Sequence, residues 1–471
     1  MDKIKTTVKT RFAPSPTGIM HFGNIRTALF NYLFAKKHNG EFLLRIEDTD
    51  KERSTKDYVT AILEDLKALN LIWDGAIIYQ SERANIYNKF YLNLIDQDLI
   101  YPCFCSEEKL AVMRKIQLSQ KLPPRYAGTC LKLTKEEINT KLANKESFSY
   151  RFKVPKDIQI IFKDLVKGQQ VFNSNDFGDF IIKRQDGTAP FMFCNAIDDA
   201  VEKVTHALRG EDHLSNTPRQ LLILQALKLQ APEYGHFPLI NGTDGLPLSK
   251  RGGSKSIKEL LLDGYLPETL LNYLARLGHN YPLEDNTLNK VLSLNQLSYN
   301  FSTDNISLHA ARHDLNHLNY WQKQAMLILN EIDLLKILQK DLDFCEIFKN
   351  NNQLDNFLQL IKSNIIMPKE AVFWAKAFFT DLISTDANNI LNNITPDFLK
   401  IIINNIKNNN FSEVIDLLKQ AGFSGKNLFV NLRVLLTGQI YGPELHKIFE
   451  LVGSDRLKNR AIYILNKISH A

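Results

Sequence analysis

The chain has 471 residues, of which 44% are hydrophobic and 23% charged, and its formal net charge is +6. This ordinary composition excludes wholesale disorder, and the length predicts roughly three domains. The sequence has no apolar N-terminal leader and no apolar run of membrane-spanning length, so we expect a cytoplasmic protein with no membrane partner. A modest positive charge is compatible with a polyanionic partner but does not indicate one.

The first fifty residues have the pattern of a strand, a turn, a helix and a second strand. A short extended segment ends near Ala13, and a Pro/Gly-rich turn follows it. Apolar residues then recur at helical spacing from Asn24 to about His38. An Asn-Gly pair ends this helix before the apolar strand 42–46. The pattern predicts a βαβ unit.

Further along the chain we expect an insertion, a return to α/β structure and a helical last third. The insertion begins near Tyr101 and returns through short strands around 147–154. In the second α/β stretch, the run 190–193 looks like a strand and the run 217–227 like a helix. From roughly Asp314 onward strand patterns nearly vanish, and apolar residues repeat every three or four positions.

The segment 11–24 places a strand end, a Pro/Gly turn and a helix start in immediate succession. Free N–H groups and the positive end of the helix dipole favour anions there. Gly23 lets a flat ring approach the backbone, and His21 can donate to phosphate oxygens. The Walker and dinucleotide-binding patterns are missing, which argues against a kinase-like or NAD site. For an isolated motif, the alternative is an ordinary turn with His21 as a helix cap.

A second motif is the hydrophilic segment 242–253, which has glycines on both sides and should therefore move. Lys250 on this loop can neutralise the charge that develops on a departing pyrophosphate. A solvent-facing basic turn is the alternative for these residues in isolation. Together with the His21 motif, the loop favours a nucleotide site.

These two motifs resemble those of the class I glutamyl-tRNA synthetases. HFGN stands in place of the family's HIGH element, and LPLSKRGGS in place of its KMSKS loop. The resemblance continues through RIEDTDKERS, WDGAIIYQSERANIY, THALRGEDHLSNTPRQ and LRVLLTGQIYGPEL, and the APSPTG turn separates this group from glutaminyl-tRNA synthetases. It implies a glutamate–tRNA ligase, expected as a monomer, that uses ATP and Mg²⁺ to charge tRNA(Glu).

The resemblance implies that His21 and Lys250 are catalytic. The expected ATP-contacting residues are Gly18, His21, Gly23, Asn24, Glu211, Asp212, His213, Ser249, Lys250 and Arg251. The expected glutamate-contacting residues are Arg11, Ala13, Ser15, Glu47, Phe191, Asn195 and Arg209. The arginines suit the two carboxylates of glutamate, and Glu47 suits its ammonium group. Which arginine meets which carboxylate stays open, and structural ion pairs are the alternative for these charges.

A cluster in the insertion, Cys103, Cys105, Tyr126 and Cys130, resembles the zinc knuckle of some family members. Zinc prefers four ligands, and no histidine follows Cys130, so Tyr126 or water would complete the site. We therefore expect clearly less than one zinc per chain in protein purified without added zinc. The other cysteines, Cys194 and Cys345, are expected in the core.

The expected fold is a Rossmann-like α/β catalytic domain with an α+β insertion, followed by an all-α anticodon-binding region. The expected boundaries are 1–100 and 180–240 for the split catalytic domain, 101–179 for the acceptor-end insertion, 241–325 for the ATP loop and stem contacts, and 326–471 for the helical anticodon-binding domain. Arg433 in the last domain is a candidate tRNA contact, with a structural role as the alternative.

Two other functions stay open from the sequence. Pro247 and Phe191 replace a lysine and a tyrosine usual in the family, which makes a catalytically inactive tRNA-binding paralogue conceivable. A glutamyl-queuosine tRNA(Asp) synthetase shares the catalytic core but lacks the helical C-terminal domain. The same two departures suggest a diverged branch, so we expect charging of tRNA(Gln) as well as tRNA(Glu).

Overall fold

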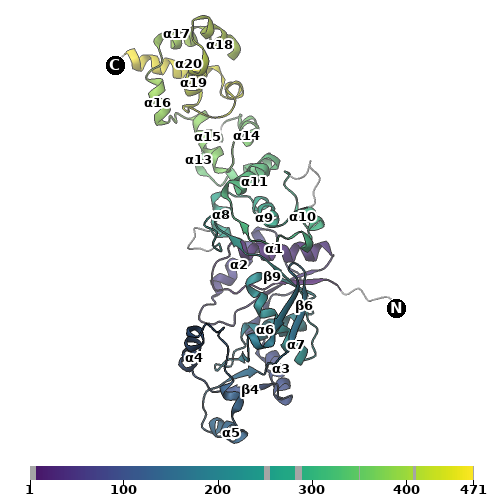
Figure 1. The fold of residues 1–471 in the computed structure, drawn as a ribbon. Helices are drawn as coiled ribbons and strands as arrows, with labels where there is room; N and C mark the ends of the chain where they lie inside the picture. Colours follow the sequence, from purple (N-terminus) through teal and green to yellow (C-terminus); the bar gives the residue numbers. More distant parts are fainter. Residues whose placement is uncertain (1–6, 249–254, 282–288, 350, 407–409, 470–471) are drawn as a thin grey trace, which may run out of the picture. The chain divides into compact units, whose positions relative to one another are not determined.

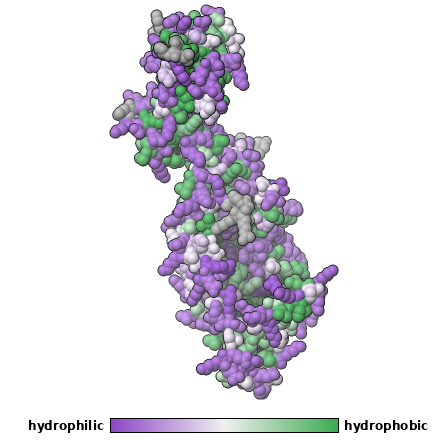
Figure 2. Space-filling view, turned by 90° about the vertical axis from the view of Figure 1, so that its left-hand side faces the viewer, coloured by the Kyte–Doolittle hydropathy of each residue, from purple (hydrophilic) through white to green (hydrophobic). Residues whose placement is uncertain are grey.

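The computed structural model describes residues 7–248, 255–281, 289–349, 351–406 and 410–469, and Figure 1 shows its elements. The chain divides into two compact units, residues 1–261 with 270–315 and residues 262–269 with 316–471. The first unit is α/β, and the described part of the second is helical, which confirms the expected fold class. None of the described helices is both long and apolar enough to cross a membrane, and hydrophilic residues cover most of the face drawn in Figure 2.

Among the described residues, the strands all lie before residue 313. They are β1 (Lys9–Phe12), β2 (Glu41–Ile46), β3 (Ile78–Tyr79), β4 (Ile100–Cys103), β5 (Ser149–Phe152), β6 (Gln159–Asp164), β7 (Gly168–Asn173), β8 (Phe180–Lys183), β9 (His206–Gly210), β10 (Glu233–Phe237), β11 (Ile240–Asn241) and β12 (Ala311–Arg312). The helices up to residue 300 are α1 (Phe22–Lys37), α2 (Lys56–Ala68), α3 (Ala84–Asp96), α4 (Glu107–Ser119), α5 (Lys135–Ala143), α6 (Phe191–Val201), α7 (Thr217–Ala226), α8 (Ile257–Asp263), α9 (Pro267–Arg276) and α10 (Leu294–Asn300).

Two sheets of the first unit adjoin each other. One has the parallel order β1-β2-β3, and the other has the order β7-β6-β10-β9. They adjoin where β1 lies beside β9, because Thr205 N–H donates to the Lys9 carbonyl at 2.9 Å and Lys9 N–H donates to Thr205 Oγ1 at 2.8 Å. The chain runs from β1 to β2 on one side and returns to β9 on the other. In α/β folds, such a switch point opens a crevice at the carboxyl ends of the strands.

The predicted βαβ unit is confirmed, and its boundaries have local causes. His21 caps α1, and Ile25, Leu29 and Leu33 of this helix are fully buried. Helix α1 ends at Lys37 with His38 as its C-cap, after which Gly40 lets the chain turn into β2. A Cβ on Gly40 would lie 2.1 Å from the Val8 carbonyl oxygen, so only glycine allows this approach.

The insertion contains an antiparallel sheet with the order β4-β5-β8. The β6–β7 hairpin follows β5 in sequence, but it joins the other sheet, where β6 runs parallel to β10. Segment 159–173, which the sequence places inside the insertion, is therefore a structural part of the sheet that carries β9.

The predicted strand at 190–193 is wrong, because Pro190 is the N-cap of α6. A four-residue apolar run fits either a buried strand or a buried helix, and length has to decide between them. Here Phe193 and Ile197 are fully buried at helical spacing. The predicted helix at 217–227 is confirmed by α7.

The second unit is a stack of short helices. Its elements are α11 (Leu315–Ile328), α12 (Glu331–Leu338), α13 (Leu342–Phe348), α14 (Leu354–Lys362), α15 (Lys369–Phe379), α16 (Thr385–Leu391), α17 (Pro396–Asn405), α18 (Phe411–Gln420), α19 (Gly425–Thr437) and α20 (Leu445–Ser469), the last kinked at Gly453. Phe357, Trp374, Phe378 and Leu432 lie in its core. Cys194 is buried as expected, but Cys345 is exposed, because α13 turns its neighbour Phe344 inward instead.

Candidate active site

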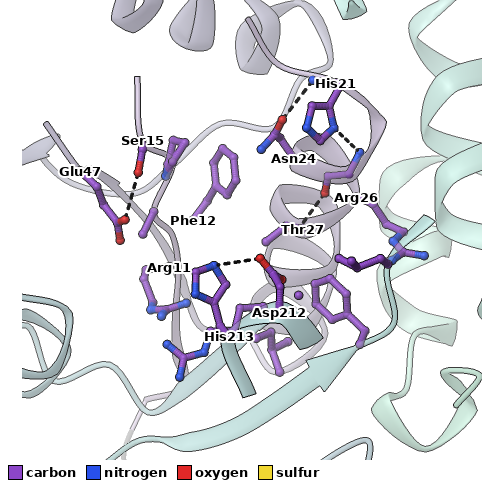
Figure 3. Close-up of a pocket in the computed structure, with 18 of the residues that line it drawn as sticks. Arg11, Phe12, Ser15, His21, Asn24, Arg26, Thr27, Glu47, Asp212 and His213 are labelled. Carbon is purple, nitrogen blue, oxygen red and sulfur yellow. Dashed lines mark hydrogen bonds and ion pairs between the residues drawn. The ribbon is translucent and has the colours of Figure 1, made fainter. Parts of the chain in front are cut away.

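The ends of β1 and β9, the loop after β1 and the first turns of α1 enclose a cavity of about 420 Å³ (Figure 3). Many of the residues singled out in the sequence line it together: Arg11, Ala13, Ser15, His21, Gly23, Asn24, Glu47, Phe191, Asn195, Arg209, Asp212 and His213. These residues come from positions as far apart as 11 and 213. The fold thus brings residues of the segments 11–47 and 191–213 together in one cavity.

The first turn of α1 forms one end of the cavity. His21 Nδ1 accepts a hydrogen bond from Gly23 N–H at 3.1 Å, and His21 N–H donates to Asn24 Oδ1 at 3.1 Å. A neutral ring that accepts at Nδ1 carries its proton on Nε2. A Cβ on Gly23 would lie 3.0 Å from His21 Cε1, so the glycine lets the ring fold over the turn. His21 is therefore a helix cap at a helix N-terminus that suits an anion.

Arg11 lines the cavity from the end of β1 and is tied to a buried carboxylate. Arg11 Nε donates to Asp199 Oδ1 at 3.0 Å, and Arg45 NH1 lies 2.8 Å from the same oxygen. Burial opposes ionisation of Asp199, but the two guanidinium groups hold the pKa of its carboxyl below its usual range. Arg45 also donates to Asn195 Oδ1 at 2.8 Å and is wholly buried. The Asp199 carboxylate thus holds the guanidinium groups of both Arg11 and Arg45.

Arg209 lines the cavity from β9 and has a different environment. Its Nε donates to His236 Nε2 at 3.1 Å, and its NH2 donates to Thr217 Oγ1 at 2.9 Å and to Gln220 Oε1 at 2.7 Å. Its NH1 is buried and has no hydrogen-bond partner among the described residues. Burial lowers the pKa of Arg209 to about 10. A buried donor of this kind calls for an acceptor, and the cavity is where a ligand would supply one.

Two further pairs shape the cavity. Ser15 Oγ donates to Glu47 Oε2 at 3.3 Å, and burial raises the pKa of Glu47 while the Arg45 charge opposes the rise. The Phe191 ring stacks on His213 with centroids 4.9 Å apart. Burial, with a contribution from the charge of Arg209, lowers the pKa of His213 to about 4. His213 is thus a neutral ring at neutral pH.

Some predicted residues do not line the cavity. Gly18 is not among its lining residues. Glu211 turns away, accepting from Lys167 Nζ at 2.6 Å and from Leu239 N–H at 3.3 Å. The predicted loop residues Ser249, Lys250 and Arg251 lie outside the described residues.

Three residues of the site were not predicted from the sequence: Arg26, Arg45 and Asp199. Arg45 left a detectable signal, since it is a charge within the apolar strand 42–46, where only a buried partner stabilises it. Asp199 left none, because it lies in α6, where no helix was predicted from the sequence. Arg26 lines the cavity and donates to the carbonyls of Pro238 and Leu277.

The cysteine cluster brings four donor atoms together. The sulfurs of Cys103, Cys105 and Cys130 all lie within 4.8 Å of one another, and those of Cys105 and Cys130 are 3.6 Å apart. The Tyr126 hydroxyl lies 3.4 Å from the Cys103 sulfur and 3.5 Å from the Cys105 sulfur. A tetrahedral zinc with Zn–S bonds of roughly 2.3 Å needs ligand atoms about 3.8 Å apart. The Cys105 and Cys130 sulfurs lie close to this spacing.

Arg433 has a structural partner within the second unit. It lies in α19, and its NH1 donates to the Pro443 carbonyl at 2.7 Å. Its role toward tRNA stays a prediction.

Comparison with known families identifies the chain. Residues 7–320 match the family described as tRNA synthetases class I (E and Q), catalytic domain. The chain belongs to this family. Residues 333–463 of the synthetase match an anticodon binding domain, which accounts for the helical second unit.

Relatives resemble the synthetase over nearly its whole length. Glutamate–tRNA ligase 1 of Coxiella burnetii (strain CbuG_Q212) is 46% identical, with 96% of this chain and 98% of the relative covered. Glutamate–tRNA ligase 2 of Nitrosococcus oceani is 44% identical, with 97% and 98% covered. Among solved structures, a glutamate tRNA ligase from Elizabethkingia meningosepticum in complex with its amino acid has a TM-score of 0.85 at 26% identity, covering 98% of this chain and 100% of that one.

Proposed function

We propose that this protein is a glutamate–tRNA ligase that activates glutamate with ATP and transfers it to the 3′ end of tRNA(Glu). The observation that carries the proposal is the cavity at the switch point, where two buried arginines and a carboxylate surround space for a small amino acid with two carboxylates and one ammonium group. Relatives that bear this name match over 96% of the chain or more. A ligase of translation works in the cytoplasm, and we propose that compartment.

The amino-acid end of the cavity suits glutamate. Arg11 and Arg209 supply cationic donors for its two carboxylates, and Glu47 with Ser15 supplies acceptors for its ammonium group. A glutamine side chain would leave one buried guanidinium inadequately paired, and that cost disfavours glutamine. Phe191 contributes an apolar ring here in place of the hydroxyl that the family usually has.

The other end of the cavity suits ATP. We assign the phosphates to the first turn of α1, where His21 Nε2 and the helix N-terminus meet an anion. The α-carboxylate of glutamate attacks the α-phosphorus of ATP, and pyrophosphate leaves to give glutamyl adenylate. The 3′-terminal ribose hydroxyl of tRNA then attacks the adenylate's carbonyl carbon, and AMP leaves. Mg²⁺ bound to the ATP phosphates would neutralise part of their charge. Lys250 is our candidate for the cation that meets the leaving pyrophosphate.

A pyrophosphate-exchange assay tests the proposal directly. Purified protein should exchange labelled pyrophosphate into ATP only when glutamate is present, and the rate is compared with and without tRNA(Glu). Absence of exchange with any tRNA would leave the inactive tRNA-binding paralogue as the explanation. Charging of tRNA(Asp) carrying queuosine would indicate the tRNA-modifying enzyme, against which the anticodon binding domain at 333–463 argues.

We also propose that the cysteine cluster is a degenerate zinc site, with Cys103, Cys105 and Cys130 as thiolate ligands and Tyr126 or water in the fourth position. A metal held there would be structural. Because only three cysteines are available, elemental analysis of protein purified without added zinc should give clearly less than one zinc per chain. Stoichiometric zinc would contradict this expectation. Tyr126 would then be the leading fourth ligand, and Tyr126→Phe should release the metal.

Charging of tRNA(Gln) remains part of the proposal. It rests on the departures at Phe191 and Pro247 alone. Aminoacylation of the two purified transcripts decides it, and charging of tRNA(Glu) alone would rule it out.

A further inference from the structure

Three neighbouring strands align a buried row of polar side chains behind the cavity. In the sheet register, His236 of β10 lies opposite Arg209 of β9, and Tyr234 of β10 lies opposite Asp164 of β6. His236 Nδ1 lies 2.5 Å from Asp164 Oδ2, and Arg209 Nε lies 3.1 Å from His236 Nε2. The side chains of Asp164 and His236 are fully buried. Only Arg209 reaches the cavity.

The hydrogen bonds assign the tautomer of His236. A guanidinium has no acceptor, so the Arg209 contact requires a lone pair on His236 Nε2. The proton of the neutral ring is then on Nδ1, where Asp164 accepts it. Burial, with a contribution from the charge of Arg209, lowers the pKa of His236, which keeps the ring neutral. Burial opposes ionisation of Asp164, but hydrogen bonds from His236 and from backbone N–H groups lower the pKa of its carboxyl.

The same contacts fix the direction of the Arg209 guanidinium. Its Nε and NH2 are held by neutral acceptors on β10 and α7, and this leaves NH1 as the edge without a partner among the described residues. Because the guanidinium is already held in one direction, the N–H groups of NH1 lose little conformational freedom when a carboxylate binds to them.

We propose that Asp164 and His236 are positioning residues for glutamate: Asp164 selects the His236 tautomer that accepts from Arg209 Nε, and this turns Arg209 NH1 toward the bound carboxylate. The proposal rests on the proposed function, since it assumes that glutamate is the ligand. It also means that the β6–β7 hairpin, on the far side of β10, takes part in amino-acid recognition.

Asp164→Asn tests which ring nitrogen of His236 carries the proton, because the surrounding hydrogen bonds fix the orientation of the new side-chain amide. Asp164 Oδ1 accepts from the backbone N–H groups of Val166, Lys167 and His236 at 2.9, 2.8 and 3.1 Å. The amide oxygen must take that position, so the NH2 group faces His236 Nδ1. The ring then shifts its proton to Nε2 and opposes Arg209 Nε with a second donor, as a carboxylate-to-amide change does in a catalytic triad.

Two substitutions of His236 separate positioning from packing. His236→Phe keeps a buried ring but removes the acceptor, whereas His236→Gln keeps an acceptor oxygen that can reach Arg209. Asp179→Asn is the matched control, because Asp179 is also an acceptor in this part of the chain, binding the Tyr101 hydroxyl at 2.6 Å and Val154 N–H at 2.9 Å. It does not line the cavity.

The measurement is glutamate-dependent pyrophosphate exchange by the full-length protein with tRNA(Glu), together with thermal unfolding. We expect Asp164→Asn and His236→Phe to raise KM for glutamate roughly 10- to 100-fold, the effect of losing one well-oriented charged hydrogen bond. KM for ATP should stay within about twofold, His236→Gln should recover most of the affinity, and Asp179→Asn should match the wild type. If the wild type itself fails to exchange, the proposed function is at fault rather than this inference.

Two results would overturn the inference. One is a fall in kcat with an unchanged glutamate KM in both variants, and the other is a His236→Gln variant as impaired as His236→Phe. If Asp164→Asn and His236→Phe do not fold, the tautomer can be read in the wild type by nitrogen NMR of labelled histidine, with His236→Gln providing the assignment. A proton on Nε2 instead of Nδ1 would refute the proposal.

Discussion

The two sides of the glutamate cavity hold their arginines by opposite means. On the β1 wall, which we define as Arg11, Arg45 and Asp199, a buried carboxylate pairs with both guanidinium groups. On the β9 wall, defined as Arg209, His236 and Asp164, the guanidinium is held by neutral acceptors, and the carboxylate lies one residue further back. The charge of Arg11 is thus partly compensated inside the protein, whereas that of Arg209 is left for a ligand.

This difference predicts that Arg209 contributes more to glutamate binding than Arg11 does. Arg209→Gln removes the cation that has no adjacent carboxylate, so kcat/KM for glutamate should fall about 10³-fold, the scale of breaking a buried ion pair. Pyrophosphate exchange at varied glutamate concentration measures it. A smaller fall in kcat/KM for glutamate than that of Arg11→Gln would show that Arg11 contributes more to glutamate binding than Arg209 does.

Arg11→Gln should have the second-largest effect. It removes one substrate contact, but Asp199 keeps Arg45 at 2.8 Å, so no buried charge is left alone. We expect kcat/KM for glutamate to fall roughly 100-fold, with a melting temperature close to that of the wild type. Asp199→Asn makes the contrast, because it leaves Arg11 without its carboxylate partner and Arg45 with only Glu202, 3.3 Å from its NH1. It should lower the free energy of unfolding by about 3 kcal/mol. Equal stability of the two variants would show that Asp199 does not hold the β1 wall.

The smallest expected effect concerns a residue that belongs to neither wall. Phe191 lines the cavity and stacks on His213, and a tyrosine there would add one hydroxyl at the position usual in the family. Phe191→Tyr should lower KM for glutamate about threefold, which corresponds to one neutral hydrogen bond. The KM for ATP serves as the internal control. A higher glutamate KM would mean that the cavity has been repacked around the smaller ring.

The sequence predicted the elements whose causes are local. The βαβ start follows from helical spacing, the His21 cap and the Gly40 turn, all within forty residues. Many of the residues that line the cavity were found through shared motifs, although Arg26 was not. What the sequence did not reveal are partnerships between distant elements: Asp199 of α6 with Arg11 of β1, and Asp164 of β6 with His236 of β10. These depend on which elements become neighbours, and neither periodicity nor spacing contains that information.

The position of β6 has a consequence for engineering this synthetase. Although the β6–β7 hairpin lies within the segment between the two halves of the catalytic domain, it pairs with β10 and supplies Asp164. A graft that exchanges residues 101–179 for the equivalent piece of a relative therefore also exchanges one support of the amino-acid site. Such a chimaera keeps its own glutamate affinity only if the graft ends before Gln159 or brings an aspartate to the same register.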